Sequence, residues 1–482
     1  MASMTRSTQV RAWAKAITHP AKEFGLTPLP VLSGAIPPGL YGSLYRNGSA
    51  RLERGGQRVG HWFDGDGAIL GVHFTNAGAS GIYRYVQTAE YKAEEKAGKL
   101  IFESYGTMPP RAVWEQFGKS PKNPANTSVI VLPDKVLALW EGGQPYALDL
   151  QTLDTIGLET LGGLKHDLPY SAHPKRDPKT GDIYNFGVTY GKSGILHIYR
   201  SDSTGQIQQQ AAIALDGLPL IHDFVLTSKY LVFFIPPVRL NPLPLLTKLK
   251  SFSDSLSWQP NKGTQILVID RDTLTVVSRG EAEPWFQWLF GNGYVDTDGC
   301  VVVDTVCYKN FQTNQYLKEV VTGQTQTTAK GTLWKIRLNP QLGKVIEMEE
   351  VLKRICDFPT VASNEVGQPS RFTYLLLHRL ETDISQERFG AIGRFDHQTR
   401  NLTEADIGNN RYPVEPIYAL DAKIPGQGWI LTIVFDGDHN SSEVWIFDAN
   451  HLDAAPVCML ALPSVVPLGF HGTWKPAYQN SV

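Results

Sequence analysis

The feature that most constrains the fold is a pattern of short apolar strands separated by turns, which recurs from about residue 127 to the end of the chain. Strand–turn–strand units are expected at 128–132 with 136–140, at 265–270 with 273–277 and at 429–435 with 444–448. Further strands are expected at 146–149, 152–155, 182–188, 230–235, 333–337 and 372–377. Irregular repetition of this kind is typical of a β-propeller. A pair of β-sandwiches is the alternative, because the repeat is too degenerate for blades to be counted.

All-β folds often run long as single units, so we interpret residues 1–482 as one domain, with 1–40 as an N-terminal extension. The segment 236–260 interrupts the pattern, and its prolines argue against a strand. An apolar helical face is expected there, beside two lysines; it is formed by Leu245, Leu246, Leu249 and Phe252. Two interpretations are compatible: a cap over one end of the core, or a surface patch that dips into a membrane to collect an apolar substrate. One further short helix is expected at 111–117.

Composition excludes several classes of protein. Lysine and arginine together number 45 against 47 acidic residues, and without a basic block nucleic acid is not an expected partner. The four cysteines are too few and too scattered for a disulfide framework or a zinc knuckle, so we expect buried thiols in a reducing compartment. The start of the chain lacks the apolar region of a secretory signal, and no stretch is long enough to span a bilayer. We therefore expect a soluble, cytoplasmic monomer.

Two acidic turns resemble calcium-binding loops, but both lack ligands at required positions. In Phe63-Asp-Gly-Asp-Gly67 the fifth and twelfth loop positions fall on Ala68 and Thr75, which offer no suitable ligands. The turn at 436–440 fails in the same way, with Phe447 at its twelfth position. Neither a dinucleotide-binding fingerprint nor a nucleophile elbow is present. Both acidic stretches are better interpreted as tight turns.

The remaining candidates for a functional site are histidines. Three lie at the mouths of apolar strands: His173 in Ser171-Ala-His-Pro174, His222 in Ile221-His-Asp-Phe224 and His471 in Phe470-His-Gly-Thr-Trp474. A single histidine in such a place most often only hydrogen-bonds a neighbour. Three neutral imidazoles at one point would suit iron, copper or zinc, and the axis of a propeller can bring distant residues together. Glu141 and Glu415 lie in similarly apolar surroundings, where the N–H of a metal-bound imidazole is a good partner for a carboxylate.

The chain resembles the carotenoid cleavage oxygenases, and most closely the apocarotenoid oxygenases. The resemblance rests on motifs in family order: Leu44-Tyr-Arg-Asn-Gly48, Phe63-Asp-Gly-Asp-Gly67, Ala125-Asn-Thr127, Leu139-Trp-Glu-Gly-Gly143, and the segments around His173, His222, Glu415 and His471. It implies a seven-bladed propeller with a helical and loop cap over an axial non-haem Fe(II). The ligand positions are then His173, His222 and His471. Glu141 and Glu415 support His222 and His471, and Thr127 lies beside the open side of the iron.

One expected ligand is missing. The resemblance places a fourth histidine within Trp285-Phe-Gln-Trp-Leu-Phe-Gly-Asn292, where this chain has Leu289. The glutamate that would support it is also changed, because Asp357 stands at that place. Both members of one supporting pair therefore differ together, which indicates a modified site; a substitution introduced at position 289 is the other explanation. Three imidazoles with open positions remain a known arrangement for non-haem iron.

The leading hypothesis is an Fe(II)-dependent dioxygenase that uses O2 to split a conjugated C=C bond of an apocarotenoid, giving retinal-type aldehydes. The polyene would lie in a tunnel lined by Trp140, Phe286, Trp288 and Tyr308 and entered through the apolar segment 236–260. The competing hypothesis is a carotenoid-binding homologue that has lost activity because of Leu289. A stilbene-cleaving oxygenase is a third.

Overall fold

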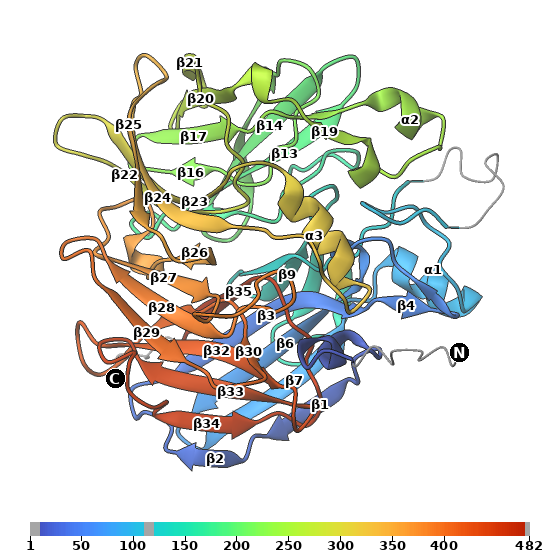
Figure 1. Ribbon diagram of the computed structural model, residues 1–482, viewed down its shortest axis with the longest axis vertical. Coiled ribbons are helices and arrows are strands. Elements are labelled where there is room, and N and C mark those ends of the chain that lie inside the picture. Colours follow the sequence, from blue (N-terminus) through green and yellow to red (C-terminus); the bar gives the residue numbers. More distant parts are fainter. Residues whose placement is uncertain (1–9, 110–119, 478–482) are drawn as a thin grey trace, which may run out of the picture.

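The computed structural model describes residues 10–109 and 120–477 as a seven-bladed β-propeller, so the two-sandwich alternative is wrong. The described residues form seven sheets of four or more strands, arranged around a common axis (Figure 1). We number the blades in chain order. The inner strands of neighbouring blades contact one another, as β35 does with β8 and β22 does with β26. Radial packing of this kind brings the inner strand of each blade to the axis.

Blade 1 combines the first and the last strand of the described residues. Its strands are β1 (Phe24–Pro28), β7 (Gly78–Tyr85), β6 (Asp66–Thr75), β3 (Gly42–Arg51) and β35 (Gly472–Pro476), in that order across the sheet. The C-terminal strand β35 pairs antiparallel with β3, Gly42 opposite Pro476 and Arg46 opposite Gly472, which closes the ring of blades. In Figure 1 the two strands, at opposite ends of the colour scale, lie side by side.

Blades 2 to 4 follow along the chain. Blade 2 is formed by β8 (Ser128–Val131), β9 (Lys135–Leu139), β10 (Tyr146–Asp149) and β11 (Thr155–Leu158). Blade 3 is formed by β12 (Lys175–Arg176), β13 (Ile183–Tyr190), β14 (Gly194–Ser201) and β15 (Ile207–Ala214). Blade 4 is formed by β16 (Val225–Leu226), β17 (Tyr230–Ile235), β20 (Thr264–Asp270) and β21 (Val276–Ala282).

Blades 5 to 7 complete the ring. Blade 5 is formed by β22 (Phe290–Val295), β23 (Val301–Tyr308), β24 (Gly331–Asn339) and β25 (Lys344–Leu352). Blade 6 is formed by β26 (Cys356–Thr360), β27 (Phe372–Leu377), β28 (Ala391–Asp396) and β29 (Leu402–Asp406). Blade 7 is formed by β30 (Arg411–Pro413), β31 (Ile417–Leu420), β32 (Gly428–Asp436), β33 (Ser441–Asp448), β34 (Cys458–Ala461) and β2 (Val31–Gly34).

Helices and short ribbons cover one face of the ring. The α-helices are α1 (Ala89–Ala97), α2 (Pro242–Leu246) and α3 (Gln312–Val320), and the ribbons are β4 (Glu53–Arg54) with β5 (Gln57–Arg58) and β18 (Val238–Leu240) with β19 (Leu256–Trp258). Short 3-10 helices span Trp13–Ile17, Trp62–Asp64, Ser253–Ser255, Pro260–Lys262 and Ser363–Glu365. In Figure 1 α3 lies across the middle of this face and α2 projects from its edge. This arrangement is a cap over the axis.

Most predicted strands are present, and β17 and β27 match their predicted bounds. The predicted return strands at 152–155 and 273–277 begin three residues too early, because an aspartate extends each turn. Asp149 Oδ1 accepts hydrogen bonds from the backbone N–H of Gln151 and Thr152, and Asp270 does the same two and three residues on. Such side-chain turns compete with strand pairing.

The prediction for 236–260 was wrong in two respects. A strand does form there, since β18 lies between the prolines and pairs with β19. The helix α2 ends at Leu246, and Lys248 has a left-handed φ of 57°, so Leu249 and Phe252 do not extend a helical face. Helices α1 and α3 were missed, although the N-cap Thr88 and the left-handed Gly98 that bound α1 are recognisable sequence signals. The helix expected at 111–117 lies outside the described residues.

Two further predictions concern cysteines and membrane spans. Cys300, Cys307, Cys356 and Cys458 are all free and buried, as expected. Within the described parts of the chain, no helix is both long enough and apolar enough to cross a bilayer. The treatment of 1–40 as an extension stays a prediction; within it, β1 and β2 pair with the outer strands of blades 1 and 7.

Candidate metal centre

The inner strands position the predicted site residues. Thr127, His173, His222, Leu289 and His471 each lie shortly before the inner strand of their blade: β8, β12, β16, β22 and β35. Because these strands start around the axis, their preceding residues meet there. The backbone joins two of these positions directly, since the N–H of His471 donates to the carbonyl of Thr127 over 3.2 Å.

Three imidazoles lie together on the axis. The ring of His173 is 4.4 Å from the ring of His222 and 5.0 Å from that of His471, centroid to centroid. Burial lowers the pKa of both His173 and His222 to about 3, so both rings are neutral near pH 7. Neutral imidazole is the form that binds transition metals.

Glu141 points into the same space from the end of β9. Its Oε1 lies 2.9 Å from Nε2 of His173 and 3.5 Å from Nδ1 of His222. The potential ligand atoms of these three residues all lie within 4.8 Å of one another. Neither Oε1 of Glu141 nor Nε2 of His173 has a hydrogen-bond partner, although both atoms are buried. Two unsatisfied polar atoms facing each other at this distance fit a cation bound beside them.

Burial raises the pKa of Glu141 to about 7, against the opposing influence of His222. A bound divalent cation would favour the charged carboxylate, and a metal-bound His222 would donate its Nδ1–H to it.

Glu415 fixes the orientation of His471. Its Oε1 lies 2.7 Å from Nδ1 of His471, and its Oε2 accepts the backbone N–H of Gly472 over 2.8 Å. Burial alone would raise the pKa of Glu415, but His471 and Arg46 together hold it below its ordinary value. An ionised carboxylate only accepts hydrogen bonds, so Nδ1 of His471 is the donor, and Nε2 is the nitrogen that would bind a metal.

Leu289 and Asp357 do not form an equivalent pair. Leu289 is buried and lines both the cavity above the imidazoles and the channel below them. Asp357 accepts hydrogen bonds from the hydroxyl of Tyr308 over 2.5 Å and from the backbone N–H of Phe358 over 2.8 Å. Phe358 has a left-handed φ of 52°, uncommon for a bulky residue, and its ring lies 5.3 Å from that of His471. The carboxylate of Asp357 is therefore engaged elsewhere.

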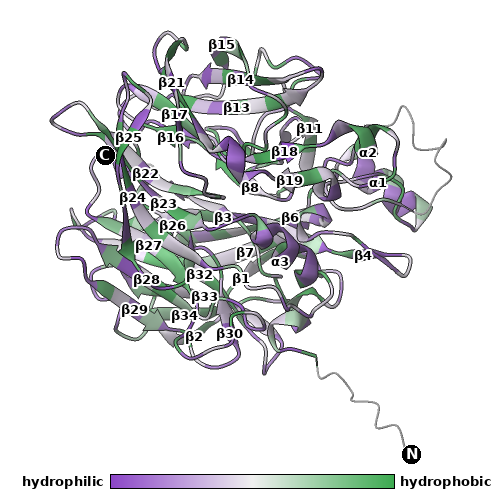
Figure 2. Cartoon of the chain, turned by 45° about the horizontal axis from the view of Figure 1, so that its top comes forward, coloured by the Kyte–Doolittle hydropathy of each residue, from purple (hydrophilic) through white to green (hydrophobic). Residues whose placement is uncertain are grey.

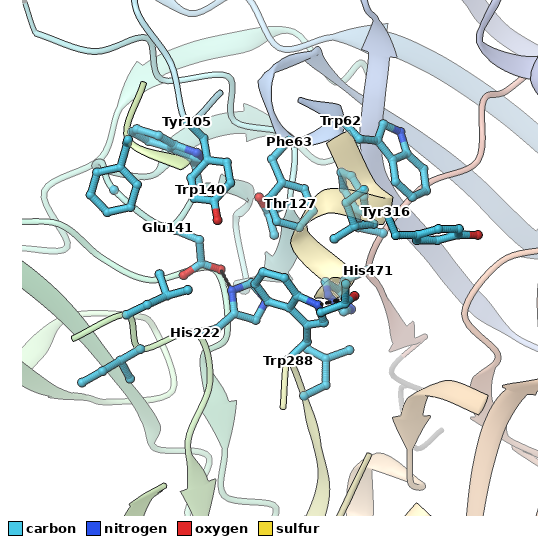
Figure 3. Close-up of a pocket in the computed structure, with 18 of the residues that line it drawn as sticks. Trp62, Phe63, Tyr105, Thr127, Trp140, Glu141, His222, Trp288, Tyr316 and His471 are labelled. Atoms are coloured by element: carbon cyan, nitrogen blue, oxygen red, sulfur yellow. Dashed lines mark hydrogen bonds and ion pairs between the residues drawn. The ribbon is translucent and has the colours of Figure 1, made fainter. Parts of the chain in front are cut away.

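A cavity of about 370 Å³ opens above the imidazoles, within the usual size range of ligand pockets. Thr127, Trp140, Trp288 and Tyr308 line it, as the sequence predicts. Phe286 is placed differently: it is fully buried behind Trp288, with ring centroids 4.7 Å apart, and does not line the cavity. Figure 3 shows Trp140 and Tyr105 on the side of Glu141, and Trp62 and Tyr316 on the opposite side.

Several lining residues were missed by sequence reasoning. They are contributed by the cap, by blade 6 and by the segment before β35, and include Trp62, Tyr105, Tyr316, His378, Arg388 and Phe470. Only α3 offers a local signal, since its buried residues Thr313, Tyr316 and Val320 recur at helical spacing. His378 and Arg388 lie in a loop, where no periodicity marks them.

Two glycine- and asparagine-containing motifs, 63–67 and 125–127, pack against each other beside this site. The side-chain amide of Asn126 donates to the backbone carbonyls of Phe63 and Gly65. A Cβ on Gly67 would lie 2.2 Å from the carbonyl oxygen of Ala125, so only glycine fits there. The two motifs thus hold the backbone that leads into Thr127.

Comparison with known proteins shows extensive similarity. A sequence model of the family described as retinal pigment epithelial membrane protein matches residues 17–476. Apocarotenoid-15,15'-oxygenase of Synechocystis is 31% identical over 458 residues, which cover 92% of each chain. Resveratrol cleavage oxygenase 1 of Aspergillus fumigatus is 26% identical over 86% of this chain and 85% of its own. The solved structure of cobalt-substituted Synechocystis apocarotenoid oxygenase superposes with a TM-score of 0.88 at 29% identity, covering 97% and 98% of the two chains.

Proposed function

Because the chain belongs to the family of the retinal pigment epithelial membrane protein, the carotenoid cleavage oxygenases, we propose that it is an Fe(II)-dependent dioxygenase acting on an apocarotenoid. The reaction would split one conjugated C=C bond with O2 and give two carbonyl products, one of them a retinal-type aldehyde. The observation that carries the proposal is the cluster of His173, His222 and Glu141, one of whose carboxylate oxygens lacks a hydrogen-bond partner, at the floor of an apolar cavity.

In this proposal His173, His222 and His471 hold the metal. Glu415 fixes the orientation of His471, and Glu141, whose Oε1 lies 3.5 Å from Nδ1 of His222, would orient that ring once a metal is bound. Fe(II) would supply the activation of O2, which no side chain can provide. A related protein has been solved with cobalt in place of its native metal, which supports a metal at this position.

The cavity would bind and orient the polyene. Trp140, Trp288 and Tyr308 provide flat apolar surfaces, and Trp288 packs edge-on to His222 with centroids 4.8 Å apart. A conjugated chain lying between these rings would exclude bulk water from the metal. Thr127 lines the cavity close to the metal position, where a small side chain leaves room for O2. No side chain is needed as a general acid or base.

Substrate entry from a membrane surface is the second part of the proposal. Leu243 and Leu246 are each 68% exposed and Leu249 is 74% exposed, which makes one projecting apolar patch. In Figure 2, α2 stands out at the edge of the molecule, away from the blades. Leu245 of the same helix lines the cavity, so apolar surface is continuous from the patch to the interior. Such a patch suits shallow insertion into a bilayer.

Metal analysis and product identification test the proposed reaction. Protein loaded with Fe(II) is incubated with an apocarotenal under air, and the products are separated and identified by mass. We expect a retinal-type aldehyde, none without Fe(II) and none from His222→Ala. Fully iron-loaded protein that releases no product from any apocarotenal would end the proposal, and cleavage of stilbenes alone would reassign the substrate.

Vesicle binding tests the patch. Replacing Leu243, Leu246 and Leu249 with serine should reduce sedimentation with lipid vesicles to near background, since each leucine contributes about 1.5–3 kcal/mol on full burial. Leu342→Ser is the matched control, because Leu342 is 64% exposed in the turn between β24 and β25. Equal vesicle binding by the wild type, the triple variant and the control would refute substrate entry from a membrane surface.

A second candidate, a polyene-binding protein without turnover, is favoured by one observation. Leu289 presents an apolar side chain to the metal position from blade 5, where a fourth imidazole would complete the ligand set. Iron occupancy of the purified protein separates the two: binding of polyenes with no retained iron supports the second candidate.

A further inference from the structure

The cavity has one strongly polar wall, and the metal centre does not use it. Arg388 lies in the loop between β27 and β28, is only 6% exposed, and lines the cavity. Its Nη1 donates a hydrogen bond to the hydroxyl of Tyr316 in α3 over 2.9 Å. The guanidinium carbon lies 4.7 Å from the ring centre of Trp62 and 5.3 Å from that of Tyr316. Aromatic rings thus hold a planar cation in place at the cavity wall.

In the part of the chain that the structure describes, Asp357 acts on this cation through space, but no carboxylate contacts it directly. None of the described carboxylates forms an ion pair with Arg388, and its Nε has no hydrogen-bond partner. Asp357, which lines the same cavity, is engaged by Tyr308 and by the backbone of Phe358, and Glu387 accepts the hydroxyl of Tyr412. Beside Arg388, the buried Nδ1 of His378 is also without a partner. A buried cation without an ion-pair partner is costly, so the arrangement indicates an anionic group that arrives with a ligand.

The position of Arg388 agrees with a ligand that crosses the axis. Leu245, Phe252 and Tyr190 line the cavity on the side of blade 3 and the projecting patch. Arg388 belongs to blade 6, three blades further around a ring of seven, and therefore lies across the axis from them. His222 and His471 line the cavity between these two ends. A linear polyene that enters beside Leu245 and passes over the imidazoles would bring its far end to Arg388.

We propose that Arg388, held by Tyr316 and Trp62, binds a carboxylate at the leading end of the polyene, so that the site selects acidic apocarotenoids. The guanidinium fork matches the two oxygens of a carboxylate, whereas an aldehyde offers one weaker acceptor and a hydrocarbon end offers none. Anchoring one end at a fixed place also determines which double bond lies over the metal. This proposal rests on the proposed function, because it assigns the substrate class of the same cavity.

Binding to the metal-free protein tests the proposal without turnover. The probes are all-trans-retinoic acid, retinal and the corresponding hydrocarbon, and the signal is quenching of tryptophan fluorescence, since Trp62, Trp140 and Trp288 line the cavity. The quantity compared is the ratio of acid affinity to hydrocarbon affinity. We expect Arg388→Met to lower this ratio by about 10- to 100-fold, the range of a hydrogen bond to a charged group, and Arg388→Lys to lower it less.

Arg394→Met is the matched control. Arg394 lies in β28 of the same blade and also stacks on an aromatic ring, Phe372, at 4.7 Å, but it does not line the cavity. Its substitution should leave the ratio unchanged. If Arg388→Met does not fold, Tyr316→Phe removes the hydroxyl that orients the guanidinium and should lower the ratio several-fold.

The possible failures are distinguishable. An unchanged ratio in folded Arg388→Met or Tyr316→Phe overturns the carboxylate site and leaves the proposed reaction standing. Absence of binding by every probe overturns the proposed polyene cavity itself, and the carboxylate site with it.

Discussion

Replacing Leu289 with histidine should restore a fourth metal ligand. Leu289 directly precedes β22, just as His471 directly precedes β35, and it lines the cavity together with His222 and His471. An imidazole at this place would therefore face the same point on the axis. Leu289 packs in a buried apolar cluster with Trp288 and Leu220, so the metal-free variant should be less stable by about 0.5–3 kcal/mol.

A minimum gain in metal affinity can be given for Leu289→His. Loss of a residue that only supports a ligand already costs about 10- to 100-fold in affinity or activity, so a new direct ligand should gain at least as much. We expect Leu289→His to retain Fe(II) through dialysis against a chelator that strips the wild type. In the cobalt form, the visible absorption spectrum should also change, because it reports the number of nitrogen ligands.

The matched control is Leu289→Phe, which introduces a planar ring without a ligand atom. A second variant, Leu289→His with Asp357→Glu, lengthens the supporting carboxylate by about 1.5 Å. It should add to the affinity, because Asp357 itself is engaged by Tyr308 and Phe358. If Leu289→His folds and binds metal no more tightly than Leu289→Phe, position 289 does not face the metal and the assignment of a missing ligand fails.

Three further predictions follow from the same geometry. Glu415→Gln should weaken metal binding by about 10- to 100-fold, because His471 loses its charged partner; Glu443→Gln, whose carboxylate only accepts from Trp445 in an outer strand, should have no effect. Chelation should abolish product formation and Fe(II), but not Mg²⁺, should restore it, since imidazole ligands favour transition metals. Burial lowers the pKa of His378 from 6.5 to about 3, so the stability it contributes is present above pH 6.5 and is lost as the pH falls toward 3. Between pH 6.5 and 5 this loss is about 2 kcal/mol, and the melting temperature of the wild type should fall more steeply than that of His378→Phe; parallel curves would contradict the burial of a neutral His378.

The propeller could be predicted because its strands carry their own signal. Continuous apolar runs such as 230–235 and 372–377 are buried on both faces, so their bounds are marked in the sequence. Turns were less predictable, since an aspartate such as Asp149 or Asp270 extends the turn by side-chain hydrogen bonds that periodicity does not reveal. The strand β18 was hidden because its partner β19 lies sixteen residues further on, beyond a helix, at Leu256–Trp258.

The convergence of three histidines on the axis was predictable for a different reason. His173, His222 and His471 lie in short motifs shared with a family, whereas the spacing of those histidines alone says nothing about convergence. Arg388 and His378 show the limit of this route, because they lie in an irregular loop and match no motif. The three-dimensional structure is needed to see that this loop faces the cavity, where Arg388 packs against aromatic rings, one of them from α3.

Every blade contributes at least one residue near the axis, so the site is assembled from separately folded sheets. Blades 2 to 7 supply Thr127, His173, His222, Leu289, Asp357 and Glu415, and blade 1 supplies His471. The backbone that carries each residue is fixed by its own sheet, so replacing one side chain leaves the other six in place. His471 is the exception, because it directly precedes β35, the strand that closes the ring against β3. A metal held by His173, His222 and His471 would therefore join the closing strand to blades 3 and 4, so that metal binding and closure of the propeller stabilise each other.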